Sequence, residues 1–160
     1  MIEIDDLAQA VARVGEAALV DDQPGIDGLA IVFARHDGNG GIDWSMTSSE
    51  KKANGNLRYA RKDQEDSWEI EFELHDKTGR GLVFPNNPHD ALWVKRANDP
   101  EDCCKTPSRY AAFTPLRLEQ ENRVLIVSNS NTTAEDLAFT LRAIPRGKDQ
   151  SKPANYFDYD

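Results

Sequence analysis

Each histidine in this chain is followed directly by an aspartate. The three pairs are His36-Asp37, His75-Asp76 and His89-Asp90. Histidine nitrogens and carboxylate oxygens are ligands for zinc and similar ions, and a carboxylate often orients a metal-bound histidine. Neighbouring residues on a strand point to opposite faces, however, and aspartate is a preferred turn residue. A metal site built from His36, Asp37, His75 and His89 is therefore one hypothesis, and structural turns are the favoured interpretation.

The segment after His36 also has features of a calcium loop. Residues 37–43 read Asp-Gly-Asn-Gly-Gly-Ile-Asp, with oxygen-bearing side chains at alternating positions around glycines. Calcium prefers such oxygen ligands, but Ser48 stands where an EF-hand has its bidentate glutamate. A tight hairpin turn explains the same glycines. We expect no cofactor, with zinc or calcium as the alternative.

Nothing in the sequence marks a catalytic nucleophile. Cys103 and Cys104 are the only cysteines, and the acidic stretch 99–102 beside them disfavours a reactive thiolate. The chain has no Gly-x-Ser-x-Gly elbow, phosphate-binding loop or Cys-x-x-Cys motif. We therefore assign no catalytic residue. Adjacent cysteines rarely meet disulfide geometry, so both are expected to be thiols, as is usual in the cytoplasm.

The C-terminal segment combines aromatic and acidic residues. Tyr156, Phe157 and Tyr159 follow the polar stretch 146–153. Each ring can bury about 150–250 Å² on a partner, so we predict these three as partner-binding residues at the end of a flexible tail. The alternatives are an inert, frayed end, or docking onto the chain's own domain or a second copy by adding a strand to an exposed edge.

Periodicity predicts one helix followed by strands. Asp6 is a good N-cap, and apolar residues recur at helical spacing over 6–20. The runs Leu29–Phe33 and Ile42–Met46 flank a glycine-rich turn and predict a hairpin. Trp68–Leu74 alternates four apolar residues with three glutamates, so the glutamates are expected to face water, with 57–61 as the neighbouring strand. Further strands are predicted at 81–84, 91–95, 112–118, 123–128 and 136–144.

These elements predict a mainly β protein. Short strands separated by turn-forming residues are typical of an antiparallel β-sandwich or a jelly-roll-like barrel. We expect residues 1–145 to form a single β-rich domain with one N-terminal α-helix, and residues 146–160 to form the flexible acidic-aromatic tail.

Charge and composition narrow the function classes. The 160 residues carry a net charge of -9, which repels nucleic acid. The chain lacks a transmembrane-length apolar run and a signal-peptide pattern, so we expect no membrane association and a cytoplasmic location. The favoured function is non-catalytic: a protein that binds a protein partner or itself, for example by capping a basic partner. The alternative is a metal-dependent enzyme or a calcium-dependent ligand-binding protein that uses the His-Asp turns.

Overall fold

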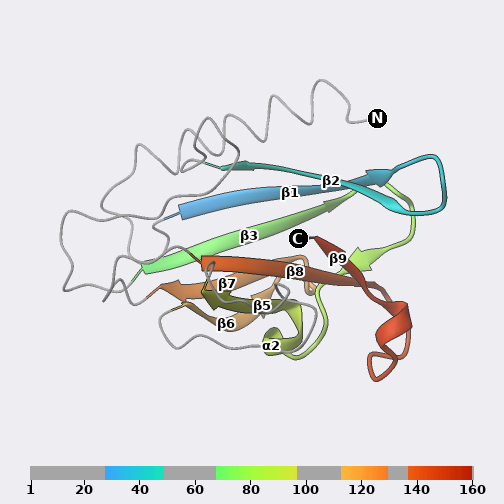
Figure 1. Ribbon diagram of the computed structural model, residues 1–160. Coiled ribbons are helices and arrows are strands. Elements are labelled where there is room, and N and C mark those ends of the chain that lie inside the picture. Colours follow the sequence, from blue (N-terminus) through green and yellow to red (C-terminus); the bar gives the residue numbers. More distant parts are fainter. Residues whose placement is uncertain (1–27, 49–67, 97–112, 130–136, 160) are drawn as a thin grey trace.

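The computed structural model describes residues 28–48, 68–96, 113–129 and 137–159 (Figure 1). This part of the chain is mainly β. Its strands are β1 (Gly28–His36), β2 (Ile42–Ser48), β3 (Trp68–Asp76), β4 (Leu82–Val83), β5 (Leu92–Arg96), β6 (Phe113–Glu119), β7 (Val124–Asn129), β8 (Leu137–Pro145) and β9 (Phe157–Tyr159). A short helix, α2 (Pro88–Ala91), precedes β5, and a 3-10 turn, η1 (Pro153–Asn155), precedes β9. The predicted helix over 6–20, the segment 57–61 and both cysteines lie outside the described residues.

The described strands form two sheets. A five-stranded sheet has the order β2-β1-β3-β7-β6, and in the second sheet β4, β5 and β9 all pair with β8. The β1–β2 hairpin is confirmed. The wholly antiparallel prediction is wrong, because β1 and β3 are parallel. β2 finishes beside the N-terminal end of β1, and β3 begins at that same end but pairs with the other edge of β1. β3 therefore runs in the same direction as β1.

Both sheets contribute to one apolar core. Ala30, Val32, Ile70 and Phe72 come from the five-stranded sheet, and Leu92, Val94, Leu141 and Ala143 come from the other. Residues 29–34 of β1 are buried on both faces, which is typical of a continuous apolar run.

The β3 strand confirms its predicted alternation but corrects its predicted exposure. Ile70 and Phe72 are fully buried, but Glu71 and Glu73 are also buried, with only 6% and 7% of their surface exposed. The prediction that these glutamates face water is therefore wrong. The paired positions on β1 and β7 are buried on the same face of the sheet, and they are occupied by aliphatic residues: Leu29, Ile31, Val124 and Ile126. Among the described strands, β3 pairs with β1 on one edge and with β7 on the other.

The C-terminal segment, predicted as a flexible tail, returns to the domain. Phe157–Tyr159 forms β9 and pairs with β8 (Figure 1). Phe157 and Tyr159 pack against the common core, which explains the order of this segment: the aromatic rings leave water by docking. Strand addition was one of the alternatives for this segment.

Candidate functional site

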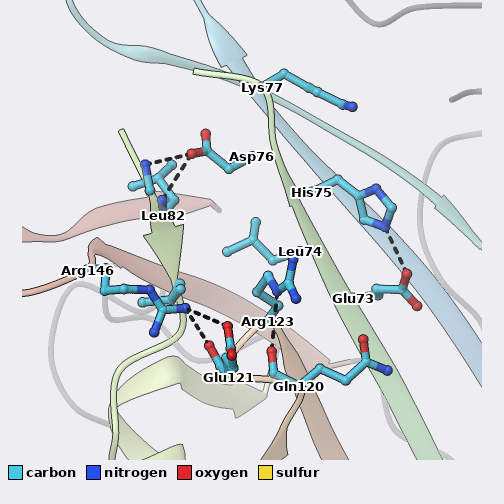
Figure 2. A pocket seen from close by; sticks show the side chains of 12 residues that line it. Glu73, Leu74, His75, Asp76, Lys77, Leu82, Gln120, Glu121, Arg123 and Arg146 are labelled. Carbon is cyan, nitrogen blue, oxygen red and sulfur yellow. Dashed lines mark hydrogen bonds and ion pairs between the residues drawn. The ribbon is translucent and has the colours of Figure 1, made fainter. Parts of the chain in front are cut away.

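A hollow of about 450 Å³ opens where β3 ends, and Figure 2 shows the side chains around it. Its walls come from the end of β3, the start of β4, the turn between β6 and β7, and the residue that follows β8. Its charged residues are Glu73, Asp76, Glu121, Lys77, Arg123 and Arg146. The hollow is therefore polar and carries charges of both signs.

Asp76 organises the turn from β3 to β4. One carboxylate oxygen accepts hydrogen bonds from the Thr78 backbone N–H at 2.8 Å and the Thr78 hydroxyl at 2.5 Å. The other accepts the backbone N–H groups of Gly81 at 2.9 Å and Leu82 at 3.0 Å. Burial acts to raise the pKa of Asp76, but these hydrogen bonds from Thr78, Leu82 and Gly81 together outweigh it and lower the pKa. Asp76 therefore serves as an ionised structural acceptor.

Glu73 and His75 form a second polar contact on the wall. His75 Nε2 lies 2.8 Å from Glu73 Oε1, and the imidazole ring packs against Phe33. A histidine oriented by a carboxylate makes up two of the three members of a nucleophilic triad. The residues that line this hollow include no serine, threonine or cysteine to act as the nucleophile. The arrangement suits recognition of a polar group.

The turn between β6 and β7 has an unusual backbone. Gln120, Glu121 and Asn122 have φ angles of 50°, 55° and 65°. This left-handed region costs a residue with a Cβ about 1–2 kcal/mol, and successive ordinary residues rarely adopt it. Such strain persists only where the surrounding structure imposes it, and it is concentrated at functional sites.

Hydrogen bonds from three other elements impose this conformation. The Asn122 carbonyl accepts the backbone N–H of Phe84 at 2.7 Å, and the Arg123 carbonyl accepts that of Leu74 at 2.8 Å. The Arg146 guanidinium donates to the Glu121 carbonyl at 2.9 Å (Figure 2). The turn is thus fixed by β3, by the residue after β4 and by the residue after β8.

A second hollow of about 390 Å³ adjoins the first and shares Val83 and Arg146 with it. Its other polar side chains are Asn86, Asn122, Gln150 and Lys148, with no carboxylate among its lining residues. The Asn122 side-chain amide donates to Asn86 Oδ1 at 2.7 Å, which ties the strained turn to this hollow as well. Both hollows therefore flank one rigid turn.

The four predicted metal ligands lie in different settings. His36 is exposed at the end of β1, and His75 lies at the first hollow. His89 lies in α2, with a buried Nδ1 that has no hydrogen-bond partner among the described residues. Asp37 Oδ1 accepts the backbone N–H groups of Asn39 at 2.6 Å and Gly41 at 3.0 Å, as a turn-forming aspartate does. Across the described ranges, no group of three or more His, Cys, Asp or Glu side chains is placed to hold a metal ion.

The predicted partner-binding aromatics contact their own domain. The Tyr156 ring lies 4.0 Å from the Arg142 guanidinium, measured to the ring centroid. Arg80 lies over the Phe157 ring, and Tyr159 stacks on Trp44. A role for these residues in binding a partner stays a prediction.

Two features were missed from sequence. Arg142 is buried, and no role was predicted for it. The strained turn contains no glycine, and Asn122 was its only residue known to tolerate a left-handed backbone. A single charged residue within an apolar strand was the one available signal for Arg142.

Within the described segments, no helix has the length and apolar character needed to cross a membrane. Neither a protein-family model nor a curated protein matches this chain.

Proposed function

We propose that this chain is a non-catalytic binding protein that caps a basic protein partner with the β6–β7 turn and the hollow beside it. The observation that carries the proposal is the run of three left-handed residues, Gln120, Glu121 and Asn122, held by hydrogen bonds from outside the turn. A rigid loop on a β scaffold is a common way to present a recognition surface.

The charge of the chain supports a basic partner. The Glu121 side chain is 78% exposed at this turn, and the chain as a whole carries a net charge of -9. The negative net charge of the chain accelerates encounter with a basic partner and disfavours acidic ones. The hollow beside the turn offers Arg123 and Arg146 as donors to polar groups of that partner.

Two further points belong to this proposal, the packing of the sheets and the location of the protein. We propose that the two sheets pack as a β-sandwich, which is supported by the single apolar cluster to which both contribute. We also propose a cytoplasmic location, supported by the adjacent cysteines Cys103 and Cys104.

The test compares two charge reversals. Wild-type protein, Glu121→Lys and Asp43→Lys are immobilised at equal density and exposed to cell extract, and a captured partner is identified, purified and titrated against each variant. Asp43 is an exposed acid on β2, at the opposite edge of the five-stranded sheet, so it controls for the change in net charge. We expect Glu121→Lys to weaken binding at least about tenfold and Asp43→Lys to weaken it only about two- to threefold.

Equal weakening by both variants would show that only net charge matters, and would contradict a contact at this turn. Both acids are in exposed ion pairs, Glu121 with Arg146 at 4.0 Å and Asp43 with Arg35 at 3.6 Å. Exposed pairs contribute about 0–1 kcal/mol, so the melting temperatures of both variants should stay close to that of the wild type. Elemental analysis separates the proposal from the metal-dependent alternative. Stoichiometric zinc or calcium in purified protein would favour that alternative.

A further inference from the structure

The Asn39-Gly40 step lies in the exposed turn between β1 and β2 (Figure 1). Asparagine is one of the thermolabile residues of proteins, because the nitrogen of the next residue can attack its side-chain amide. A following glycine favours this attack, since it has no Cβ to crowd that nitrogen and its backbone rotates easily. The step can react in the folded protein only if the turn leaves both the amide and the nitrogen accessible.

The Gly40 backbone nitrogen and the Asn39 side chain are both accessible. Both residues are exposed, and a Cβ placed on Gly40 would meet no other atom within 4 Å. Among the described residues, no hydrogen bond uses the Gly40 N–H or the Asn39 side-chain amide. Other atoms hold the step in place: the Asn39 backbone N–H donates to Asp37 Oδ1 at 2.6 Å, and the Gly40 carbonyl accepts Arg80 Nη2 at 2.8 Å. The reacting groups therefore stay available while the turn is folded.

The neighbouring Asp37-Gly38 step could react through the same ring, but the turn holds its carboxylate elsewhere. Asp37 Oδ1 accepts the backbone N–H groups of Asn39 and Gly41. Asp37 Oδ2 lies so close to Gly41 that a Cβ there would collide with it. The carboxylate thus faces Gly41, and a carboxylate is a poorer electrophile than a carboxamide. The fold therefore favours reaction at Asn39 over reaction at Asp37.

We propose that Asn39 is a modification site, at which the Gly40 nitrogen converts the side-chain amide to aspartate or isoaspartate in the folded protein. The Gly40 nitrogen gives its proton to hydroxide and bonds to Asn39 Cγ, and the bond from Cγ to the side-chain nitrogen breaks. That nitrogen takes a proton from water and leaves as ammonia. Water then opens the succinimide ring at either carbonyl, which gives the two products. Water is the only co-reactant, and no atom is oxidised or reduced.

The modification changes both the charge and the length of the turn. It adds a negative charge to a turn that already carries Asp37 and is followed by Asp43. The isoaspartate product also carries the main chain through the former side chain, which lengthens a turn closed by the hydrogen bond from the Asp37 N–H to the Gly41 carbonyl at 3.4 Å. This turn is distinct from the β6–β7 turn, so the inference does not depend on the function proposed there.

The test incubates the native protein at mildly alkaline pH, with its fold checked by circular dichroism, and follows the reaction by mass spectrometry. Digestion with trypsin at mildly acidic pH gives residues 36–51 and 53–58 as separate peptides, so the other asparagine-glycine step, Asn54-Gly55, is measured apart. Asn39 has the only side-chain amide in the peptide 36–51. We expect this peptide to gain the mass of an amide-to-acid exchange, with isoaspartate at position 39 and release of ammonia.

Two variants test the route of the reaction. Asn39→Gln is the matched control, because it keeps a side-chain amide but must close a larger ring, and its peptide should show no measurable conversion. Gly40→Ala should convert at least about tenfold more slowly than the wild type, because a Cβ hinders the attacking nitrogen. Conversion of Asn39→Gln or Gly40→Ala at the wild-type rate would overturn attack by the Gly40 nitrogen.

A synthetic peptide of residues 36–51 separates the effect of the fold from that of the sequence. Because an exposed turn opens at little cost, the native protein should convert Asn39 within about tenfold of the rate in the peptide. Isoaspartate at position 37 should form in the peptide but not in the native protein. A native protein that shows no conversion while the peptide reacts would overturn the proposal, since the fold would then protect the step.

Discussion

The β1–β2 turn and the β6–β7 turn both join neighbouring antiparallel strands, but they obtain left-handed backbone in opposite ways. In the first turn, Gly38 and Gly40 adopt φ angles of 86° and 84°. Glycine adopts such angles without a steric penalty. In the second turn, Gln120 to Asn122 adopt similar angles with full side chains.

The partners of the two turns explain the difference. The Asp37 carboxylate binds amides within its own turn, and the distant Arg80 adds a hydrogen bond to the Gly40 carbonyl at 2.8 Å, so the glycine-rich turn is specified mainly by local residues. In the β6–β7 turn, the Gln120 carbonyl accepts a hydrogen bond from the backbone N–H of Arg123 within the turn. The next three carbonyls accept hydrogen bonds from Arg146, Phe84 and Leu74, which lie far away in sequence. Glycines let the β1–β2 turn adopt left-handed angles without strain. The β6–β7 turn keeps larger side chains at such angles, and the strain lowers the stability of the fold.

The largest expected effect comes from comparing two aspartates that each organise a turn, the partly buried Asp76 and the exposed Asp37. Asp76→Ala should lower the free energy of unfolding by about 2–3 kcal/mol, because four hydrogen bonds to a partly buried carboxylate are lost. Asp37→Ala should lower it by less than about 1 kcal/mol, because that carboxylate is exposed and water replaces its two bonds. Urea unfolding measures both. Equal losses would show that burial does not distinguish these turns.

The same carboxylate predicts a pH dependence. Its pKa is lowered below 3.8 in the folded protein, so its contribution to stability is complete above that value and is lost as the pH falls through the folded pKa. Asp76→Asn removes this titration. Between about pH 5 and pH 3, unfolding free energy should therefore decline more steeply for the wild type than for Asp76→Asn. Parallel declines would contradict the ionised acceptor.

Gly40→Ala tests whether the first turn depends on glycine. An alanine at a φ of 84° should destabilise the protein by about 1–2 kcal/mol. Asn39→Ala is the matched control at an adjacent exposed position, and it should change stability by less than about 0.5 kcal/mol. Thermal denaturation of both variants checks this. A neutral Gly40→Ala would mean that this position tolerates a residue with a Cβ at that backbone angle.

The smallest expected effect is an increase in stability. Gln120→Gly should stabilise the protein by about 0.5–1 kcal/mol, because glycine relieves the left-handed strain while losing some chain entropy on folding. The Gln120 side chain is exposed, so little packing is lost. A more stable variant would confirm that the β6–β7 turn is strained, and a destabilised one would show that its conformation costs little.

Local patterns predicted the strands well because their causes are local. Alternation placed Ile70 and Phe72 on one face of β3, and Asp, Asn, Gly and Pro residues marked the breaks between strands. The metal hypothesis needed residues from different elements to converge, which periodicity cannot test. His36, His75 and His89 were grouped only because each is followed by an aspartate.

The sequence by itself determined which residues share a strand face and where the chain turns, because side-chain alternation and turn preference act over a few residues. Only the tertiary structure decided which strand faces are buried. Glu71 and Arg142 both sit at positions that alternation assigns to a polar face, yet both are buried. Glu71 shares its buried sheet face with aliphatic residues of β1 and β7, and Arg142 is enclosed by Trp93 and the returning C-terminal segment. Burial depends on strand order and on contacts between distant segments, which no short window of sequence contains.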